Sequence, residues 1–175
     1  MEISKERLAV LEKLREISYE EIKVLLDTKQ NVDPTAGIII VKLDKPPVSG
    51  ELNQEYDFYA ARVLPPSPNN PNFVNPHYHN KGTEPYRFLF GTGEMNKGIV
   101  KNGEVVWNEP KNVGPNDEVE IEGGTVHSFR NTEKEPADFA FACPKNHLIN
   151  NDSEHPEGDR YFTKNLKNGV PPWYK

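Results

Sequence analysis

Residues 77–91 read HYHNKGTEPYRFLFG, and this stretch says most about the fold. His77 and His79 are separated by one residue, so on an extended strand both imidazoles point to one face and Tyr78 points to the other. The next four residues are typical of a turn, and Glu84 then leads into a second strand-like run, residues 85–90. The stretch therefore predicts two strand segments joined by a turn, with two imidazoles and a carboxylate near that turn.

A third histidine, His127, lies in a later strand-like segment, residues 126–130. If sheet pairing brings it beside the first two, three imidazoles and one carboxylate form a donor set that Fe, Mn, Ni, Co and Zn ions accept. The single cysteine, Cys143, excludes a site built from several thiolates, and an all-oxygen calcium or magnesium site would not need three histidines. We therefore expect one divalent transition metal, with a coordination position open to water or substrate.

Short strands separated by turn residues fill most of the chain after residue 34. Asn102-Gly103 predicts a tight hairpin, because both central turn positions need positive φ. The Pro- and Asn-rich residues 65–76 cannot hold a regular ladder and are expected to form an ordered loop. This pattern indicates an all-β barrel or sandwich. The other expected strands are residues 37–43, 56–64, 98–101, 104–107, 119–121 and 137–143.

Two short amphipathic helices are expected before the strands, within residues 4–28. Ser4 is a candidate N-cap, and Ser18 with Glu21 matches a capping box, so the helices should be separated near Ser18. The apolar positions expected to face inward are Leu8, Leu11, Leu14, Ile17, Ile22, Leu25 and Leu26. The predicted organisation is a helical extension over residues 1–34, a barrel over residues 35–143 and a tail over residues 144–175 that wraps the barrel.

Two motifs resemble those of the cupin superfamily. The spacing His77-x-His79-x4-Glu84-x6-Gly91 is similar to the first cupin motif, and Gly124-x2-His127-x3-Asn131 is similar to the end of the second. The resemblance covers about residues 56–143. It implies a double-stranded β-helix, or jelly-roll barrel, with a metal near its mouth, and it implies that the ligands are His77, His79, Glu84 and His127.

The sequence departs from the cupin pattern at three turn positions. Pro71 stands where the family has a glycine six residues before His77, Glu122 stands where it has a proline, and Gly114 is two residues early. These positions shape turns and bind no metal, so the departures affect loop geometry more than ligation.

Alternation along the strands extends the predicted site. Tyr86 and Phe88 should share the face of Glu84, and Phe129 should share the face of His127. We predict that Tyr86, Phe88 and Phe129 contact a small, partly apolar ligand, with Tyr86 also a candidate catalytic residue. The competing interpretation for these rings, above all for Phe88, is ordinary barrel packing. No cofactor besides the metal is predicted.

The remaining histidines, His147 and His155, lie in the polar tail and are expected at the solvated surface.

Charge and hydropathy limit the classes of partner that this protein is expected to bind. The chain of 175 residues has 21 Lys and Arg against 27 Asp and Glu, and its net charge of −6 disfavours nucleic acid and anionic membrane surfaces. The aliphatic run of residues 38–41 is too short to span a bilayer, and the first residues do not match a signal peptide. We expect a cytoplasmic protein that binds a small molecule. The N-terminal helices and the aromatic tail are compatible with a homodimer.

Three functions remain open at this point. The leading hypothesis is dioxygenase-type chemistry, because the chain resembles cupins with three histidines and one glutamate, such as acireductone and quercetin dioxygenases. The second is a sugar or sugar-phosphate isomerase or epimerase, in which a metal stabilises an enediolate. Against it stand the short gap before Glu84 and the scarcity of cations other than Lys81 and Lys97. The third is a small-molecule-binding cupin without catalysis. The sequence leaves the substrate and the native metal undetermined.

Overall fold

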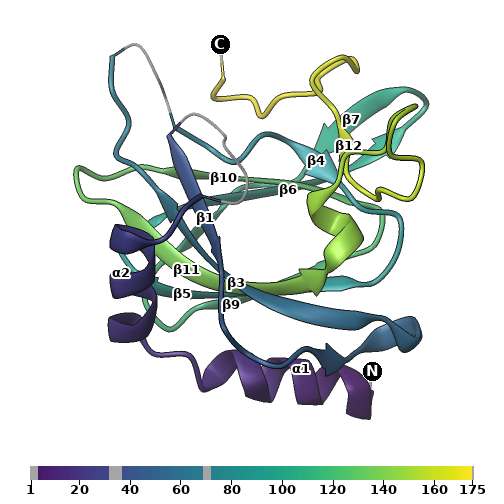
Figure 1. Cartoon of the computed structure of the whole chain (residues 1–175). Coiled ribbons are helices and arrows are strands. Elements are labelled where there is room, and N and C mark those ends of the chain that lie inside the picture. Colours follow the sequence, from purple (N-terminus) through teal and green to yellow (C-terminus); the bar gives the residue numbers. More distant parts are fainter. Residues whose placement is uncertain (1–3, 32–36, 69–71, 175) are drawn as a thin grey trace.

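The computed structural model describes residues 4–31, 37–68 and 72–174 (Figure 1). The elements in chain order are α1 (Lys5–Arg15), α2 (Tyr19–Thr28), β1 (Ile38–Lys42), β2 (Val48–Ser49), the 3-10 helix η1 (Glu51–Asn53), β3 (Glu55–Val63), β4 (His77–Tyr78), β5 (Thr83–Phe90), β6 (Gly93–Lys101), β7 (Glu104–Trp107), β8 (Lys111–Val113), β9 (Glu118–Glu122), β10 (Thr125–Asn131), β11 (Ala137–Pro144), the 3-10 helix η2 (Lys145–Leu148) and β12 (Tyr161–Phe162).

The strands form two antiparallel sheets. The first has the order β1-β3-β11-β5-β9, with β2 on β3, and the second has the order β12-β4-β10-β6-β7, with β8 on β6. Non-consecutive strands are neighbours in both sheets, and the chain crosses repeatedly from one sheet to the other. This arrangement confirms the predicted all-β jelly-roll barrel.

Every predicted strand is present, although several boundaries move. β6 begins at Gly93 rather than at residue 98, and it pairs with β7 across the predicted hairpin, where Asn102 and Gly103 have φ of 52° and 79°. The strands that the sequence pattern missed, β2, β8 and β12, have only two or three residues each. Residues 69–71 of the predicted loop lie outside the described residues.

The two predicted helices are also confirmed, with the break at Ser18. The hydroxyl oxygens of Ser4 and Ser18 accept hydrogen bonds from the backbone N–H groups of Arg7 and Glu21, each at 3.2 Å. Leu8 was expected to face inward but is 40% exposed, whereas Val10 is buried. A spacing of three residues is shorter than the 3.6-residue period of a helix, so residues spaced in this way do not all lie on one face. Leu8 therefore lies outside the buried face.

The helices cover the outer face of the first sheet (Figure 1). Their buried side chains, including Leu14 and Ile22, pack against Val41 and Phe58 on that face. Burial of each such aliphatic side chain stabilises the fold by about 1.5–3 kcal/mol.

The inner faces of the two sheets enclose an aromatic core. Phe88 of the first sheet and Phe129 of the second have ring centroids 5.1 Å apart, and Phe139 lies 5.2 Å from Phe88 and 5.5 Å from Phe129. All three are buried. This packing fills one part of the barrel interior and leaves the part near β4 for polar side chains.

The segment after β11 packs against the second sheet. β12 pairs with β4, with Tyr161 opposite Tyr78 and Phe162 opposite His77, and the Thr163 N–H donates to the Pro76 carbonyl at 3.0 Å. Figure 1 shows this C-terminal segment, coloured from green to yellow, with β12 beside β4.

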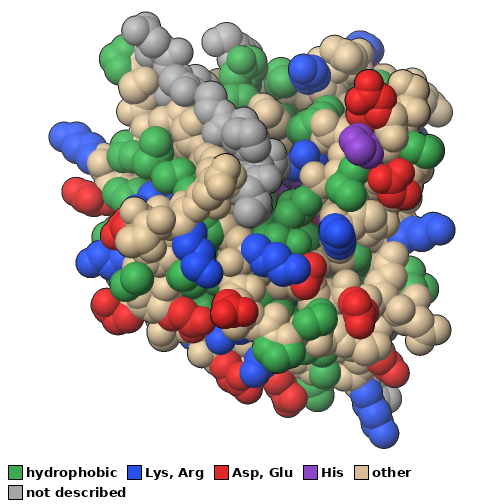
Figure 2. Space-filling view, in the orientation of Figure 1, with side chains coloured by type: hydrophobic (Ala, Val, Ile, Leu, Met, Phe, Trp, Pro, Cys, Tyr) green, Lys and Arg blue, Asp and Glu red, His purple; other side chains and the backbone are tan. Residues whose placement is uncertain are grey.

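The surface is mixed in charge. On the face shown in Figure 2, Lys and Arg side chains alternate with Asp and Glu side chains. Among the described residues, no helix has the length and apolar character needed to cross a membrane.

Candidate metal centre

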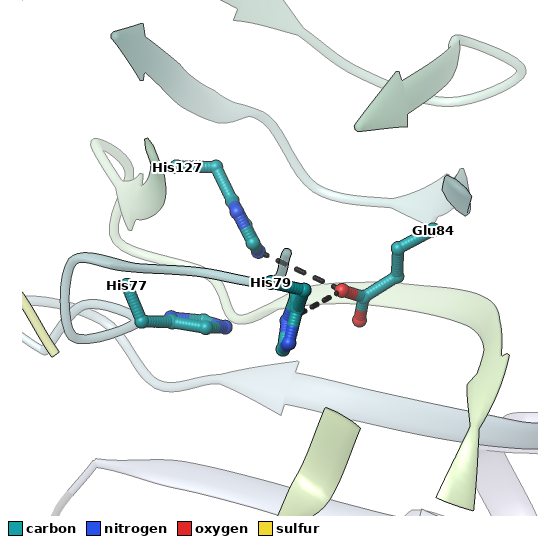
Figure 3. A group of neighbouring side chains, drawn as sticks. All are labelled: His77, His79, Glu84 and His127. Carbon is teal, nitrogen blue, oxygen red and sulfur yellow. Dashed lines mark ion pairs between the residues drawn. The ribbon is translucent and has the colours of Figure 1, made fainter. Parts of the chain in front are cut away.

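Four side chains converge inside the barrel (Figure 3). One donor atom from each of His77, His79, Glu84 and His127 lies within 4.8 Å of the other three, and all four side chains are buried. His77 lies on β4, and His79 directly follows that strand. Glu84 lies on β5 and His127 lies on β10. The structure therefore brings together the four residues whose spacing resembles the cupin ligand set.

Sheet pairing explains how residues so far apart in sequence meet. His77 on β4 lies directly opposite His127 on β10 in the second sheet. The chain then turns through Gly82, which has φ of +77°, and enters β5 in the first sheet. Because this turn crosses from one sheet to the other, Glu84 faces the histidines across the barrel.

Each of the three imidazoles is oriented by a backbone carbonyl. The Nδ1–H groups of His77, His79 and His127 donate to the carbonyl oxygens of Asn75, Asp159 and Thr125, at 2.6, 2.7 and 3.3 Å respectively. A carbonyl can only accept, so the proton of each neutral ring lies on Nδ1 and the lone pair lies on Nε2. Metal-binding histidines commonly have their second nitrogen held in this way.

The contact between His79 and Glu84 tests whether the site suits a cation. Nε2 of His79 lies 3.0 Å from Oε2 of Glu84, yet neither atom has a hydrogen-bond partner within the described part of the chain. Both atoms offer lone pairs in the neutral imidazole and ionised carboxylate, so they repel each other at this distance. A metal ion bound by both would remove the repulsion and satisfy two buried polar atoms, and the donor set therefore fits a divalent transition metal.

Burial keeps two of the imidazoles neutral. It lowers the pKa of His77 well below its usual value, and the neighbouring His127 and His79 lower it further. Burial likewise lowers the pKa of His127 to about 4. Neutral rings are the form that binds a metal, so both are available as ligands at neutral pH.

Tyr86 lies beside the four candidate ligands, as alternation along β5 predicts. Its hydroxyl donates to Oε1 of Glu84 at 3.0 Å and lies 3.3 Å from Nε2 of His127. Burial raises the pKa of Tyr86 well above its usual value, and the charge of Glu84 raises it further. The hydroxyl therefore stays protonated and acts as a donor to Glu84.

His147 is where the sequence-based expectation was wrong. It was placed at the solvated surface, but in η2 it is only 1% exposed and its ring stacks on His79, with centroids 4.0 Å apart and planes 4° apart. Burial follows from the packing of η2 against β3 and β11, which local polarity does not reveal. His155, by contrast, is exposed, as expected.

Asp159, which sequence reasoning did not single out, holds the same region together. Besides its carbonyl contact to His79, its carboxylate accepts hydrogen bonds from the backbone N–H groups of Asn80 and Lys81, at 3.0 and 3.2 Å. It thus fixes the turn that separates His79 from Glu84.

A cavity of about 50 Å³ adjoins the candidate ligands. Its described lining includes Tyr86 but neither Phe88 nor Phe129, which lie in the aromatic core instead. The residues that line it are Ile38, Ile40, Ala61, Val74, Asn75, His77, Glu84, Tyr86, Phe139, Phe141, His147, Leu148, Arg160 and Phe162.

Comparisons with known proteins bear on the fold. A comparison with protein-family models gave no match, and a comparison with curated protein sequences gave none either. Among solved structures, oxalate oxidase in complex with the substrate analogue glycolate superposes with a TM-score of 0.50 at 18% identity, over 65% of this chain and 54% of that one. A recombinant oxalate oxidase in complex with glycolate gives the same values.

This chain thus spans about half the length of oxalate oxidase. A further neighbour, KdgF from Halomonas sp., has a TM-score of 0.47 at 14% identity, over 65% of this chain and 84% of that one. At 18% identity the likeness to oxalate oxidase concerns the fold. Together with the two curled antiparallel sheets, it shows that this chain has the double-stranded β-helix fold of the cupins.

Proposed function

We propose that this protein binds one divalent transition metal through His77, His79, Glu84 and His127 and acts on a small molecule by dioxygenase-type chemistry. The observation that carries the proposal is that one donor atom from each of three imidazoles and one carboxylate oxygen lie within 4.8 Å of one another inside the barrel. A metal bound there would supply Lewis-acid or redox chemistry to an oxygen atom of the substrate. Four protein ligands would leave one or two coordination positions for that oxygen.

The surrounding residues prepare the ligands for this role. The carbonyls of Asn75, Asp159 and Thr125 fix the imidazoles, so little reorganisation is needed on binding. The Tyr86 hydroxyl donates a hydrogen bond to Oε1 of Glu84, so Oε2 is the carboxylate oxygen that faces His79 and His127. Because Tyr86 also lines the cavity, its hydroxyl is within reach of a bound substrate and is our candidate catalytic residue.

The cavity favours a small substrate with little charge. Most of its walls are aliphatic or aromatic, and Arg160 is the single Lys or Arg in its described lining. Lys81 and Lys97, the cations considered for a sugar-phosphate isomerase, do not line it, and the Lys97 ammonium group donates to the Glu120 carbonyl at 2.6 Å. A phosphorylated sugar would meet little compensating charge here. The geometry therefore favours an enolisable, partly apolar compound that offers oxygen atoms to the metal.

Metal loading and oxygen consumption test this proposal together. The full chain is stripped with a chelator, reloaded separately with Fe(II), Mn(II), Ni(II), Co(II) or Zn(II), and assayed for bound metal. An oxygen electrode then records uptake over a panel of enolisable hydroxyketones and diketones. Oxygen uptake by the Fe(II) or Ni(II) form would support the proposal if it is lost in the His127→Ala variant and kept in the His155→Ala variant.

Two other outcomes would contradict parts of it. Isomerisation of the same compounds under nitrogen by the Mn(II) or Zn(II) form would replace oxidative chemistry with Lewis-acid chemistry. Stoichiometric metal without turnover under either condition would mean that the protein binds its ligand without catalysis.

A further inference from the structure

His147 lies at the metal centre without belonging to the four-residue cluster. It is contributed by η2, after the last long strand of the barrel, and it lines the cavity together with His77, Glu84 and Tyr86. Its ring is buried and stacks on the ring of His79. A polar side chain in this position needs partners for both ring nitrogens.

One nitrogen of His147 has a partner and the other has none. Nε2 lies 2.9 Å from the carbonyl oxygen of Lys81, and because a carbonyl only accepts, Nε2 carries the proton. In the neutral ring, Nδ1 is then an acceptor. It is buried, it has no hydrogen-bond partner among residues 4–31, 37–68 and 72–174, and it lies 3.8 Å from Oε2 of Glu84, which also only accepts.

A metal ion alone would not resolve this. It would engage Oε2 of Glu84 and Nε2 of His79, two other fully buried atoms of the centre that lack hydrogen-bond partners among the described residues. Nδ1 of His147 would still face the cavity without a donor. A hydroxyl of a molecule bound in the cavity, which His147 lines, would supply the missing donor.

We propose that His147 is a substrate-binding residue, whose Nδ1 accepts a hydrogen bond from a hydroxyl of the metal-bound substrate. This inference rests on the proposed metal-dependent function. Since Nδ1 lies only 3.8 Å from a candidate ligand atom, the hydroxyl must be close to the metal. It therefore sits on the carbon next to the coordinated oxygen, or is itself coordinated. The substrate class is an α-hydroxy carbonyl compound or the enediol derived from it, and the cavity of about 50 Å³ limits it to a few carbons at the metal end.

A pair of small probes separates this hydrogen bond from metal chelation. Hydroxyacetone and methoxyacetone both present a carbonyl and an adjacent oxygen, but only hydroxyacetone can donate a hydrogen bond. Each is titrated into Co(II)-loaded full-length protein, and the visible absorption of the metal reports binding. We expect the wild type to bind hydroxyacetone about tenfold more tightly than methoxyacetone, the effect of one buried hydrogen bond.

His147→Phe keeps a planar ring against His79 and removes the acceptor, so its ratio of the two affinities should approach one. The matched control, His155→Phe, should keep the wild-type ratio, because His155 is exposed. A variant that loads Co(II) normally and retains the full preference for hydroxyacetone would overturn the assignment of His147. Failure of the wild type to load metal would overturn the proposed function itself.

A measurement on the wild-type protein tests the role of His147 even if the His147→Phe variant does not fold. Long-range ¹H–¹⁵N spectra of the histidines in the diamagnetic Zn(II) form distinguish a protonated from an unprotonated ring nitrogen. We expect an unprotonated Nδ1 for His147, and we expect its resonance to shift with hydroxyacetone but not with methoxyacetone. A protonated Nδ1, or equal shifts with both probes as displacement of a water would give, would contradict the proposal.

Discussion

Nδ1 of His79 lies 2.7 Å from the backbone carbonyl oxygen of Asp159, a residue 80 positions later in the chain. This contact joins the first motif to the C-terminal segment, and the Asp159 carboxylate adds two hydrogen bonds to the turn that follows His79. The segment after the barrel is therefore part of the site's architecture, because it orients a candidate ligand and supplies His147.

Asp159→Ala should weaken both the fold and metal binding. The substitution keeps the carbonyl but leaves the N–H groups of Asn80 and Lys81 without acceptors, which should cost roughly 2–4 kcal/mol of unfolding free energy. Loosening of the turn should reduce metal affinity by about 10- to 100-fold. Urea unfolding of the metal-free protein and a competition titration with a chelating dye measure the two effects. Asp152→Ala is the control, since Asp152 is exposed and accepts only local hydrogen bonds. Equal behaviour of the two variants would refute this role for Asp159.

His77→Ala and His127→Ala should each reduce bound metal steeply, because each removes a donor that is held on a strand. Elemental analysis of reloaded protein should show wild-type metal content in His155→Ala. Normal metal content in both ligand variants would mean that the four residues are not the ligands.

Tyr86→Phe should change turnover or probe affinity while metal content stays at the wild-type level. The variant keeps the ring and removes only the hydroxyl that contacts Glu84 and His127. Oxygen uptake and Co(II) titrations with hydroxyacetone provide the comparison. If neither differs from the wild type, Tyr86 serves packing alone.

The metal-free protein should lose stability as the pH falls from about 6.5 to about 4. The pKa of His127 is about 4 in the folded protein and near 6.5 in the unfolded chain, so between these values the unfolded chain binds a proton that the folded protein does not. The unfolding free energy therefore decreases with decreasing pH, by roughly 3 kcal/mol from this residue. Urea midpoints over this range in the presence of a chelator should show the decline, and His127→Asn should make it less steep, with the remaining decline coming from His77, whose pKa is also lowered by burial. Parallel profiles for the two proteins would contradict the prediction.

The sequence was most informative where structure is local. Alternation placed His77 and His79 on one face, and the Asn102-Gly103 turn fixed a hairpin, because both depend on neighbouring residues. Alternation also placed Phe88 on the inner face of β5. It does not show how far along the barrel a side chain lies from the candidate metal site. Phe88 lies four residues beyond Glu84, which is about 13 Å along a strand, and its ring reaches the aromatic core instead of the cavity.

The contribution of the C-terminal segment could not be predicted, because it depends on pairing between distant residues. β12 has only two residues, too few for a periodic pattern, yet its pairing with β4 brings the nearby Asp159 to the site, whereas His147 is carried by η2, which contacts β3 and β11. The apolar Leu148 beside His147, which packs against the core, was a local sign that the segment turns inward.

The most direct test of the metal centre is a crystal structure of the reloaded protein with an anomalous difference map recorded at the absorption edge of the added metal. We expect one strong peak inside the barrel, about 2.0–2.2 Å from Nε2 of the three histidines and from a carboxylate oxygen of Glu84. A map without a peak there, or with the metal held by other residues, would contradict it.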